Sequence, residues 1–144
     1  METMQQIAAR LDLQPHPEGG FYRRTYCSDT RLDGRGTASA ILFLLDGDAP
    51  TLWHTTDGDE LWFWQAGSTM TLETALNDGA LETVLLGPDS AQEQHFQALV
   101  PAGTWQRSCS RGSWTLVSCV VSPEFRFEGY ELVTDPNWMP GQPR

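Results

Sequence analysis

The stretch of residues 50–67, PTLWHTTDGDELWFWQAG, decides the fold. One histidine, His54, stands six residues before a glutamate, Glu60, and the polar turn TDGD separates them. Alternation along ELWFWQAG places Glu60, Trp62 and Trp64 on one face of a strand. Because the turn is short, the two segments are predicted to be adjacent antiparallel strands, with His54 and Glu60 as cross-strand neighbours. A polar pair beside an aromatic wall is typical of sites that shift the pKa values of carboxylate and imidazole groups.

The rest of the chain repeats this pattern of short strand-like runs between turns. The runs are rich in β-branched and aromatic residues and are bounded by glycine, proline and aspartate; they are FYRRTYC, TASAILFLL, MTLETAL, LETVLLG, QALVPAG and WTLVSCVVS. NDG at residues 77–79 predicts a hairpin between the third and fourth of them. Regular short strands of this kind favour an all-β antiparallel barrel or sandwich.

The N-terminal segment is the exception to this strand pattern. In TMQQIAARLDLQ, Ile7 and Leu11 have helical spacing and Thr3 is placed to cap the helix, while Pro15 and Pro17 end it. No proline- or serine-rich linker and no repeat divides the chain, which predicts a single domain. We expect the helix and a loop over residues 1–20, the barrel over 21–133 and an irregular, proline-containing tail over 134–144.

Composition narrows the classes of partner and compartment. The chain has 144 residues, a formal net charge of -10 and a pI of about 4.5, which disfavours nucleic acid and anionic lipid as partners because the overall field repels phosphates. Cys27, Cys109 and Cys119 have no CxxC spacing, and Cys119 is interpreted as a small core residue. With no apolar run of 18 residues and no secretory leader pattern, we expect a cytoplasmic protein that does not span a membrane.

Two motifs in this chain resemble those of the cupin superfamily. In the first cupin motif, His54 matches the first histidine, Glu60 the glutamate and Gly67 the closing glycine. The second, Pro-x-Gly-x-x-His, resembles PAGTWQ, with Pro101 and Gly103 in place. The resemblance implies a double-stranded β-helix, the jelly-roll barrel of the cupins, here with a short N-terminal helix.

This chain departs from the cupin motifs at two of the positions that usually bind a metal ion. Thr56 stands where the first motif has its second histidine, and Gln106 stands where the second motif has its histidine. A divalent metal prefers three or more histidine or carboxylate ligands, so the expected cofactor is none. If an ion is held at all, the predicted ligands are His54, Glu60 and Gln106, and they would bind it weakly.

A second resemblance covers the whole chain. HPEGGFYRRTY, DELWFWQAG and VPAGTW look like an uncharacterised branch of the cupins related to sugar-epimerase-like barrels, with HPEGGFYRRTY as the most distinctive part. It implies a small barrel, usually a homodimer, whose reaction is not assigned. The resemblance therefore specifies the fold more closely than the function.

The opening motif also adds candidate ligand-binding residues. On FYRRTY, alternation separates Phe21, Arg23 and Thr25 from Tyr22, Arg24 and Tyr26. If the first face looks into the barrel, Arg23 is a fixed cation for a carboxylate or phosphate; otherwise it pairs with Glu18 or Glu60, or covers a strand edge.

The predicted site joins this strand to the two motifs. His54 and Glu60 are the predicted catalytic residues; the predicted ligand-binding residues are Glu18, Tyr22, Arg23, Trp62, Trp64 and Gln106. His16 is interpreted as a surface or turn residue and His95 as a solvated histidine, both without a role.

Three functions remain open for this pocket. The preferred one is a metal-independent isomerase or epimerase acting on a small polar molecule, with His54 as acid or base, Glu60 orienting it, and Tyr22 or Tyr26 as the second acid–base group. The alternatives are a non-catalytic module that binds a small molecule against its tryptophans, and a metal-dependent lyase or oxygenase.

Overall fold

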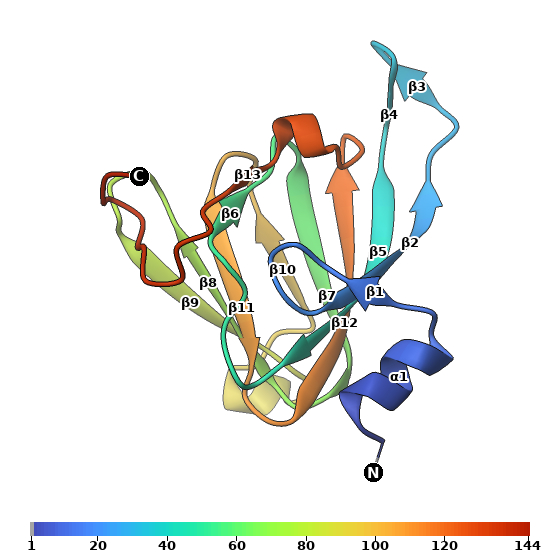
Figure 1. The fold of residues 1–144 in the computed structure, drawn as a ribbon, viewed down its shortest axis with the longest axis vertical. Helices are drawn as coiled ribbons and strands as arrows, with labels where there is room; N and C mark the ends of the chain where they lie inside the picture. The colour runs from blue at the N-terminus through green and yellow to red at the C-terminus, as the bar shows by residue number, and fades with distance from the viewer. Residues whose placement is uncertain (1) are drawn as a thin grey trace.

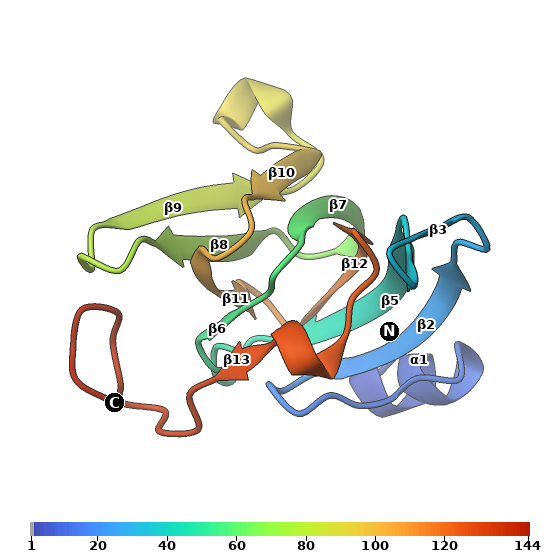
Figure 2. The same cartoon turned by 90° about the horizontal axis from the view of Figure 1, so that it is seen from above.

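Two antiparallel sheets face each other in the computed structural model, which describes residues 2–144 (Figures 1 and 2). The six strands of the larger sheet, in spatial order, are β1 (Gln14–Pro15), β2 (Phe21–Cys27), β5 (Ser39–Asp46), β12 (Trp114–Ser122), β7 (Asp59–Gly67) and β10 (Gln97–Val100). The five strands of the smaller sheet are β13 (Glu131–Leu132), β6 (His54–Thr55), β11 (Trp105–Ser110), β8 (Met70–Ala75) and β9 (Leu81–Leu86). A separate hairpin pairs β3 (Arg31–Leu32) with β4 (Arg35–Gly36). The predicted all-β jelly-roll class is confirmed.

The helix α1 (Met4–Arg10) covers the outer face of the larger sheet (Figure 2). As predicted, Thr3 caps it, and its side chain and that of Gln6 form a reciprocal capping box. Ile7 packs with Leu44 of β5 and with Phe21 of β2. The apolar side of the helix therefore contacts the face of β2 that carries Phe21, and this turns Tyr22 toward the interior.

Apolar side chains from both sheets fill the space between them. Phe43 and Trp62 come from the larger sheet and Met70, Leu72 and Leu86 from the smaller one, and each is at most 2% exposed. Burial of side chains this large contributes about 1.5–3 kcal/mol each. Phe43 and Trp62 also form part of a cavity wall, so the core supports the site directly.

The predicted pairing of the His54 and Glu60 segments is wrong. Strand β6 pairs with β11 and β13 in the smaller sheet, whereas β7 pairs with β12 and β10 in the larger one. The TDGD turn crosses from one sheet to the other instead of forming a hairpin. Gly58 makes this crossing tight, since a Cβ there would lie 2.9 Å from the Pro123 carbonyl oxygen. His54 and Glu60 consequently approach the interior from opposite sheets.

The hairpin predicted at residues 77–79 is confirmed. The hairpin at NDG joins β8 to β9, with Gly79 at a φ of 84°. The sequence FRFEGYEL forms the 3-10 turn η2 (Phe127–Gly129) and the short strand β13. The other 3-10 turn, η1 (Ser90–Gln92), precedes β10. None of the helices within residues 2–144 has the length and apolar character needed to cross a membrane.

Candidate active site

A cavity of about 420 Å³ opens between the inner face of the larger sheet and the segment 125–130. Its wall is apolar on the side of Phe43, Trp62 and Val121, and its polar groups come from four separate segments of the chain. Those polar groups include Glu18, His54 and Glu60, all of them buried. A concave, mostly apolar site with a few converging polar groups is the usual form of a small-molecule site.

Glu60 is held by a chain of hydrogen bonds behind the cavity wall. The Gln106 side-chain amide donates to Glu60 Oε1 over 2.8 Å, and the Trp62 indole N–H donates to Gln106 Oε1 over 3.0 Å. Because the indole can only donate, it fixes which end of the Gln106 amide faces Glu60. Burial raises the pKa of Glu60 to about 7, although hydrogen bonds from Gln106 and Cys119 act in the opposite direction. Glu60 therefore exchanges a proton close to neutral pH.

His54 is neutral, and its tautomer follows from its contacts. Its Nδ1 lies 3.0 Å from the Leu52 carbonyl oxygen, which can only accept, so Nδ1 carries the proton. Burial lowers the pKa of His54 to about 4, against a partly opposing hydrogen bond to Leu52. The other ring nitrogen, Nε2, is thus an unprotonated acceptor near pH 7.

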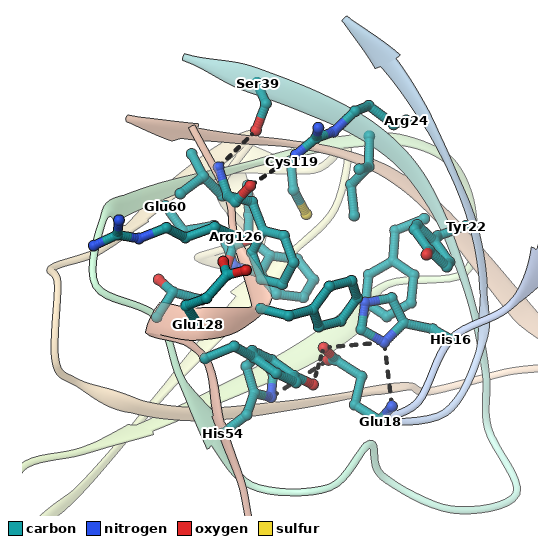
Figure 3. A pocket seen from close by; sticks show the side chains of 18 of the residues that line it. His16, Glu18, Tyr22, Arg24, Ser39, His54, Glu60, Cys119, Arg126 and Glu128 are labelled. Carbon is teal, nitrogen blue, oxygen red and sulfur yellow. Dashed lines mark hydrogen bonds and ion pairs between the residues drawn. The ribbon is translucent and has the colours of Figure 1, made fainter. Parts of the chain in front are cut away.

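Glu18 lies between two histidine rings (Figure 3). Its Oε1 is 3.4 Å from His16 Nδ1, its Oε2 is 3.4 Å from His54 Nδ1, and the Tyr130 hydroxyl donates to Oε1 over 3.1 Å. Burial raises the pKa of Glu18 well above its usual range, and the nearby Glu60 carboxyl raises it further. Burial, and then His54, lower the pKa of His16 to about 3. These contacts therefore join neutral groups rather than ions.

The HPEGG turn explains how the sequence places Glu18. The backbone N–H of Glu18 donates to His16 Nδ1, the N–H of Gly19 donates to the His16 carbonyl, and the Leu52 N–H donates to the Glu18 carbonyl. Gly20 has a φ of 75°, and a Cβ there would lie 2.6 Å from the Leu44 carbonyl oxygen. Only glycine fits this position, which brings the turn against β5 and directs Glu18 into the barrel.

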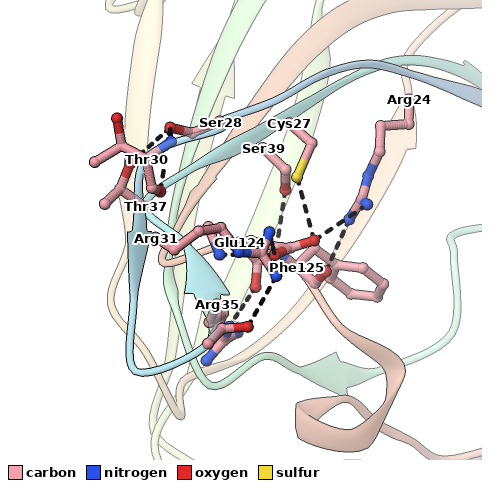
Figure 4. Close-up of polar contacts among 12 residues, drawn as sticks. Arg24, Cys27, Ser28, Thr30, Arg31, Arg35, Thr37, Ser39, Glu124 and Phe125 are labelled. Atoms are coloured by element: carbon pink, nitrogen blue, oxygen red, sulfur yellow. Dashed lines mark hydrogen bonds and ion pairs between the residues drawn. The ribbon is translucent and has the colours of Figure 1, made fainter.

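The cavity mouth is fixed by a polar network around Glu124 (Figure 4). The Glu124 carboxylate accepts from the Gly36 N–H over 2.8 Å and lies within 3.5 Å of the Arg24 and Arg31 guanidinium groups. Arg24 also donates to the Phe125 carbonyl over 2.8 Å. These bonds hold the start of the segment 125–130, whose other end carries Tyr130.

The structure brings most of the predicted site residues together, but it rearranges their contacts. Glu18, Tyr22, His54, Glu60 and Trp62 line the cavity. Glu60 is oriented by Gln106 and not by His54, whose neighbour is Glu18. Gln106, which was predicted to bind the ligand, is fully buried behind Glu60 and does not line the cavity.

Arg23, Trp64 and Tyr26 lie outside the cavity, which corrects their predicted places. Arg23 is on the outer face of β2 and donates to the Leu11 carbonyl at the end of α1. Trp64 donates to the Ser68 carbonyl and packs on the core. An irregularity in the pairing of β2 between Arg24 and Tyr26 breaks the alternation, and Tyr26 is 56% exposed.

Several residues that line the cavity were not predicted from the sequence, among them His16, Arg24 and Tyr130. His16 does lie in a turn, but its side chain is only 6% exposed and lines the cavity, so it is not a surface residue. Its position two residues before Glu18 in one tight turn was a usable signal. Tyr130 lies 112 positions from Glu18 in the chain, and no local pattern connects them.

A metal of the kind that the cupin motifs imply does not fit the donors present. Within residues 2–144, no group of three or more histidine, cysteine, aspartate or glutamate side chains is arranged to hold a metal ion. Gln106 Oε1, one of the weak ligands predicted from the sequence, already accepts from Trp62. Thr56, at the position of a motif histidine, donates its hydroxyl to the Gly58 carbonyl. Strong donors are therefore replaced by groups that bind the protein itself.

Comparisons with known proteins agree with this architecture. Residues 5–133 match the family described as cupin superfamily (DUF985). Protein SO0799 from Shewanella oneidensis is 37% identical, with 92% of this chain and 85% of that chain covered and a TM-score of 0.87. A hypothetical protein from Leishmania major is 30% identical, with 92% and 88% covered and a TM-score of 0.85.

More distant structures share the fold alone. Oxalate decarboxylase from Bacillus subtilis is 13% identical, with 87% of this chain and 31% of that chain covered and a TM-score of 0.65. No curated protein matches this chain.

Proposed function

This chain belongs to the DUF985 family of the cupin superfamily, and we propose that its cavity is the active site of a metal-independent proton-transfer enzyme of the isomerase or epimerase kind. The observation that carries the proposal is the convergence of two buried carboxyl groups, Glu18 and Glu60, on one cavity from separate segments of the chain. Buried carboxyl groups are costly for stability, so their placement in a small-molecule cavity supports a chemical role.

Glu60 is the group that takes up and returns a proton. At neutral pH a carboxyl group with a pKa of about 7 is present in both forms, which suits general acid–base catalysis. Gln106 holds it in one orientation without neutralising its charge. A base of this kind removes a proton from a bound molecule and delivers it to the same or to a neighbouring atom, which is the chemistry of isomerases and epimerases.

Neutral and cationic groups complete the site. His54 Nε2 is free to accept a hydrogen bond from a substrate hydroxyl, since Nδ1–H is committed to Leu52. Arg24 and Arg126 line the cavity mouth and offer positive charge to an anionic end of a substrate. The cavity volume of about 420 Å³ suits a small molecule.

Hydrogen exchange tests the proposal even when the product of the reaction has not been identified. Small hydroxy acids, oxo acids and sugar derivatives that raise the unfolding midpoint are incubated with the protein in D2O, and deuterium incorporation at carbon is followed by proton NMR. The expected result is exchange that Glu60→Gln slows by at least about 100-fold, since positioned acid–base groups contribute about 10²–10⁴ in rate. Glu82→Gln, at an exposed site on β9, is the matched control and should leave exchange unchanged. Equal exchange in Glu60→Gln, or binding without exchange for every compound, would contradict the proposal.

A non-catalytic binding module is the second candidate, favoured by the apolar wall of Phe43, Trp62 and Val121. It predicts that Trp62→Ala loses affinity while Glu60→Gln binds as well as the wild type. Binding without exchange in the same experiment would support it.

A further inference from the structure

One oxygen of Glu18 is left without a hydrogen-bond partner inside the cavity. The residue is 5% exposed and lines the cavity, and its Oε2 has no partner among the described residues. A buried polar atom without a partner costs about 1–3 kcal/mol. An atom in this state at a cavity wall is suited to a partner that the bound molecule supplies.

The groups around Glu18 determine whether its Oε2 is protonated. Tyr130 donates to Oε1, which leaves Oε2 as the atom that carries the proton of the neutral acid. His54 Nδ1, 3.4 Å from Oε2, already carries its own proton toward Leu52 and so cannot accept one. Among the described residues, the only basic side chains within ion-pair distance of Glu18 are the two neutral histidines. No cation therefore favours the carboxylate, and burial keeps the pKa of Glu18 high.

We propose that Glu18 Oε2–H, positioned by Tyr130, donates a hydrogen bond to a carbonyl oxygen of the substrate, so that the site takes small aldehydes or ketones. This inference rests on the proposed function, because it assigns the substrate class of the same acid–base site. A carboxylic acid kept neutral by an apolar environment is an effective donor to an oxygen that gains negative charge.

The chain offers few other ways to stabilise that charge. All nine positions counted as lysine or arginine are arginine, so no lysine is present to form a Schiff base with the carbonyl. Arg24 and Arg126 lie at the mouth, where they are 41% and 50% exposed, and they are engaged with Glu124 and Asp57. Glu18 is the donor that lies deep in the cavity.

The proton-transfer step balances within the site. Glu60 carboxylate removes a proton from the carbon beside the carbonyl, and the electron pair of that C–H bond becomes the C=C bond of the enolate. The π electrons of the carbonyl move to oxygen, where the hydrogen bond from Glu18 Oε2–H strengthens. Glu60 then returns the proton, or a solvent deuteron that has replaced it, to the same carbon, which regenerates the carbonyl and the Glu60 carboxylate. In an α-hydroxy aldehyde or ketone, the hydroxyl proton can instead pass to the original carbonyl oxygen while Glu60 protonates the former carbonyl carbon, which moves the carbonyl to the adjacent carbon. Neither an oxidant nor a reductant is needed.

Binding of 4-nitrophenol tests this assignment, because its phenolate oxygen resembles the oxygen of an enolate. The measurement is made in Glu60→Gln, whose neutral amide stands in for protonated Glu60, and absorbance distinguishes phenolate from phenol. In the double variant that also carries Glu18→Gln, the glutamine amide keeps a donor at the same place. Its affinity for 4-nitrophenol should differ from that of Glu60→Gln by less than about threefold. In the double variant that also carries Glu18→Leu, the donor is removed. Binding of 4-nitrophenol should then be weaker than in Glu60→Gln by about 10- to 100-fold, the range for a hydrogen bond to a charged group.

Two outcomes would overturn the assignment. One is equal loss of affinity in Glu18→Gln and Glu18→Leu, because the donor that glutamine keeps would then make no difference. The other is that no change at Glu18 alters the affinity, or that 4-nitrophenol does not bind at all. If Glu18→Leu does not fold, infrared difference spectra of wild type against Glu18→Gln serve instead. They should show the carbonyl band of a protonated carboxylic acid, shifted in Tyr130→Phe, at neutral pH. Absence of that band would equally overturn the assignment.

Failure of this inference and failure of the proposed function have different signatures. If Glu60 is not a catalyst, deuterium exchange is absent or unaffected by Glu60→Gln, while the dependence of 4-nitrophenol binding on Glu18 persists. If Glu18 is not the donor, exchange survives with Glu18→Leu, and 4-nitrophenol binding does not distinguish Gln from Leu at that position.

Discussion

Replacing Glu60 by Gln should stabilise the protein at alkaline pH and do so much less at acidic pH. Glu60 is 7% exposed and its nearest donor, Gln106, is neutral, so ionising it in the folded state is costly. A group whose folded pKa is raised makes the folded state bind more protons than the unfolded state. Its stabilising contribution is therefore complete below the unfolded pKa of 4.5 and is lost as pH rises toward the folded value of about 7. Glutamine has no such dependence.

The size of the effect follows from these two values. At about 1.4 kcal/mol per pH unit, the interval from 4.5 to about 7 corresponds to about 3 kcal/mol in the free energy of unfolding. Roughly 1 kcal/mol of this cost is already present at pH 5, and nearly all of it is present at pH 8. The difference between Glu60→Gln and wild type should thus grow by about 2–3 kcal/mol from pH 5 to pH 8. Any constant effect of the amide on packing cancels in this comparison.

Urea unfolding followed by tryptophan fluorescence at the two pH values measures this difference, because six tryptophans report on the fold. Glu82→Gln serves as the control and should show the same difference from wild type at both pH values. If Glu60→Gln changes stability equally at pH 5 and pH 8, Glu60 is not held in a raised-pKa environment, and the reasoning from its burial fails.

Three further predictions follow from the same contacts. Gln106→Leu removes the partner of both Trp62 Nε1–H and Glu60, and urea unfolding should show a loss of about 2–4 kcal/mol; a neutral effect would mean that water replaces the amide. Gly20→Ala places a Cβ 2.6 Å from the Leu44 carbonyl oxygen at a φ of 75°, so it should cost about 2 kcal/mol or more in the same assay, and a loss within error would show that the turn can relax. Dialysis against EDTA should leave the midpoint of thermal unfolding unchanged, and a decrease reversed by one particular ion would reveal a metal site that the donor geometry does not suggest.

Features encoded locally were predictable from the sequence. The cap at Thr3 and the hairpin at NDG each depend on a few neighbouring residues, and each was found as expected. The strand runs and the two cupin motifs identified the barrel, because alternation and turn residues are legible along the chain.

Features that depend on packing between distant segments were not predictable. Phe21 of β2 packs against α1, which places Arg23 on the outer face. Arg24 lines the cavity in its place. The contact between Tyr130 and Glu18 joins opposite ends of the chain. The TDGD turn was interpreted as a hairpin, but it crosses from one sheet to the other. The two residues of β6 pair with β11 and β13 instead of with β7.

The proton affinity of Glu60 is the most direct test of a metal-free acid–base site in this cavity. It is measured by carbon-13 NMR titration of protein containing glutamate labelled at the side-chain carboxyl, with the Glu60 signal assigned by its absence from Glu60→Gln. The expected midpoint is at a pH of about 7. A midpoint near the ordinary value of 4.5 would contradict it, because Glu60 would then be a permanently ionised carboxylate at neutral pH.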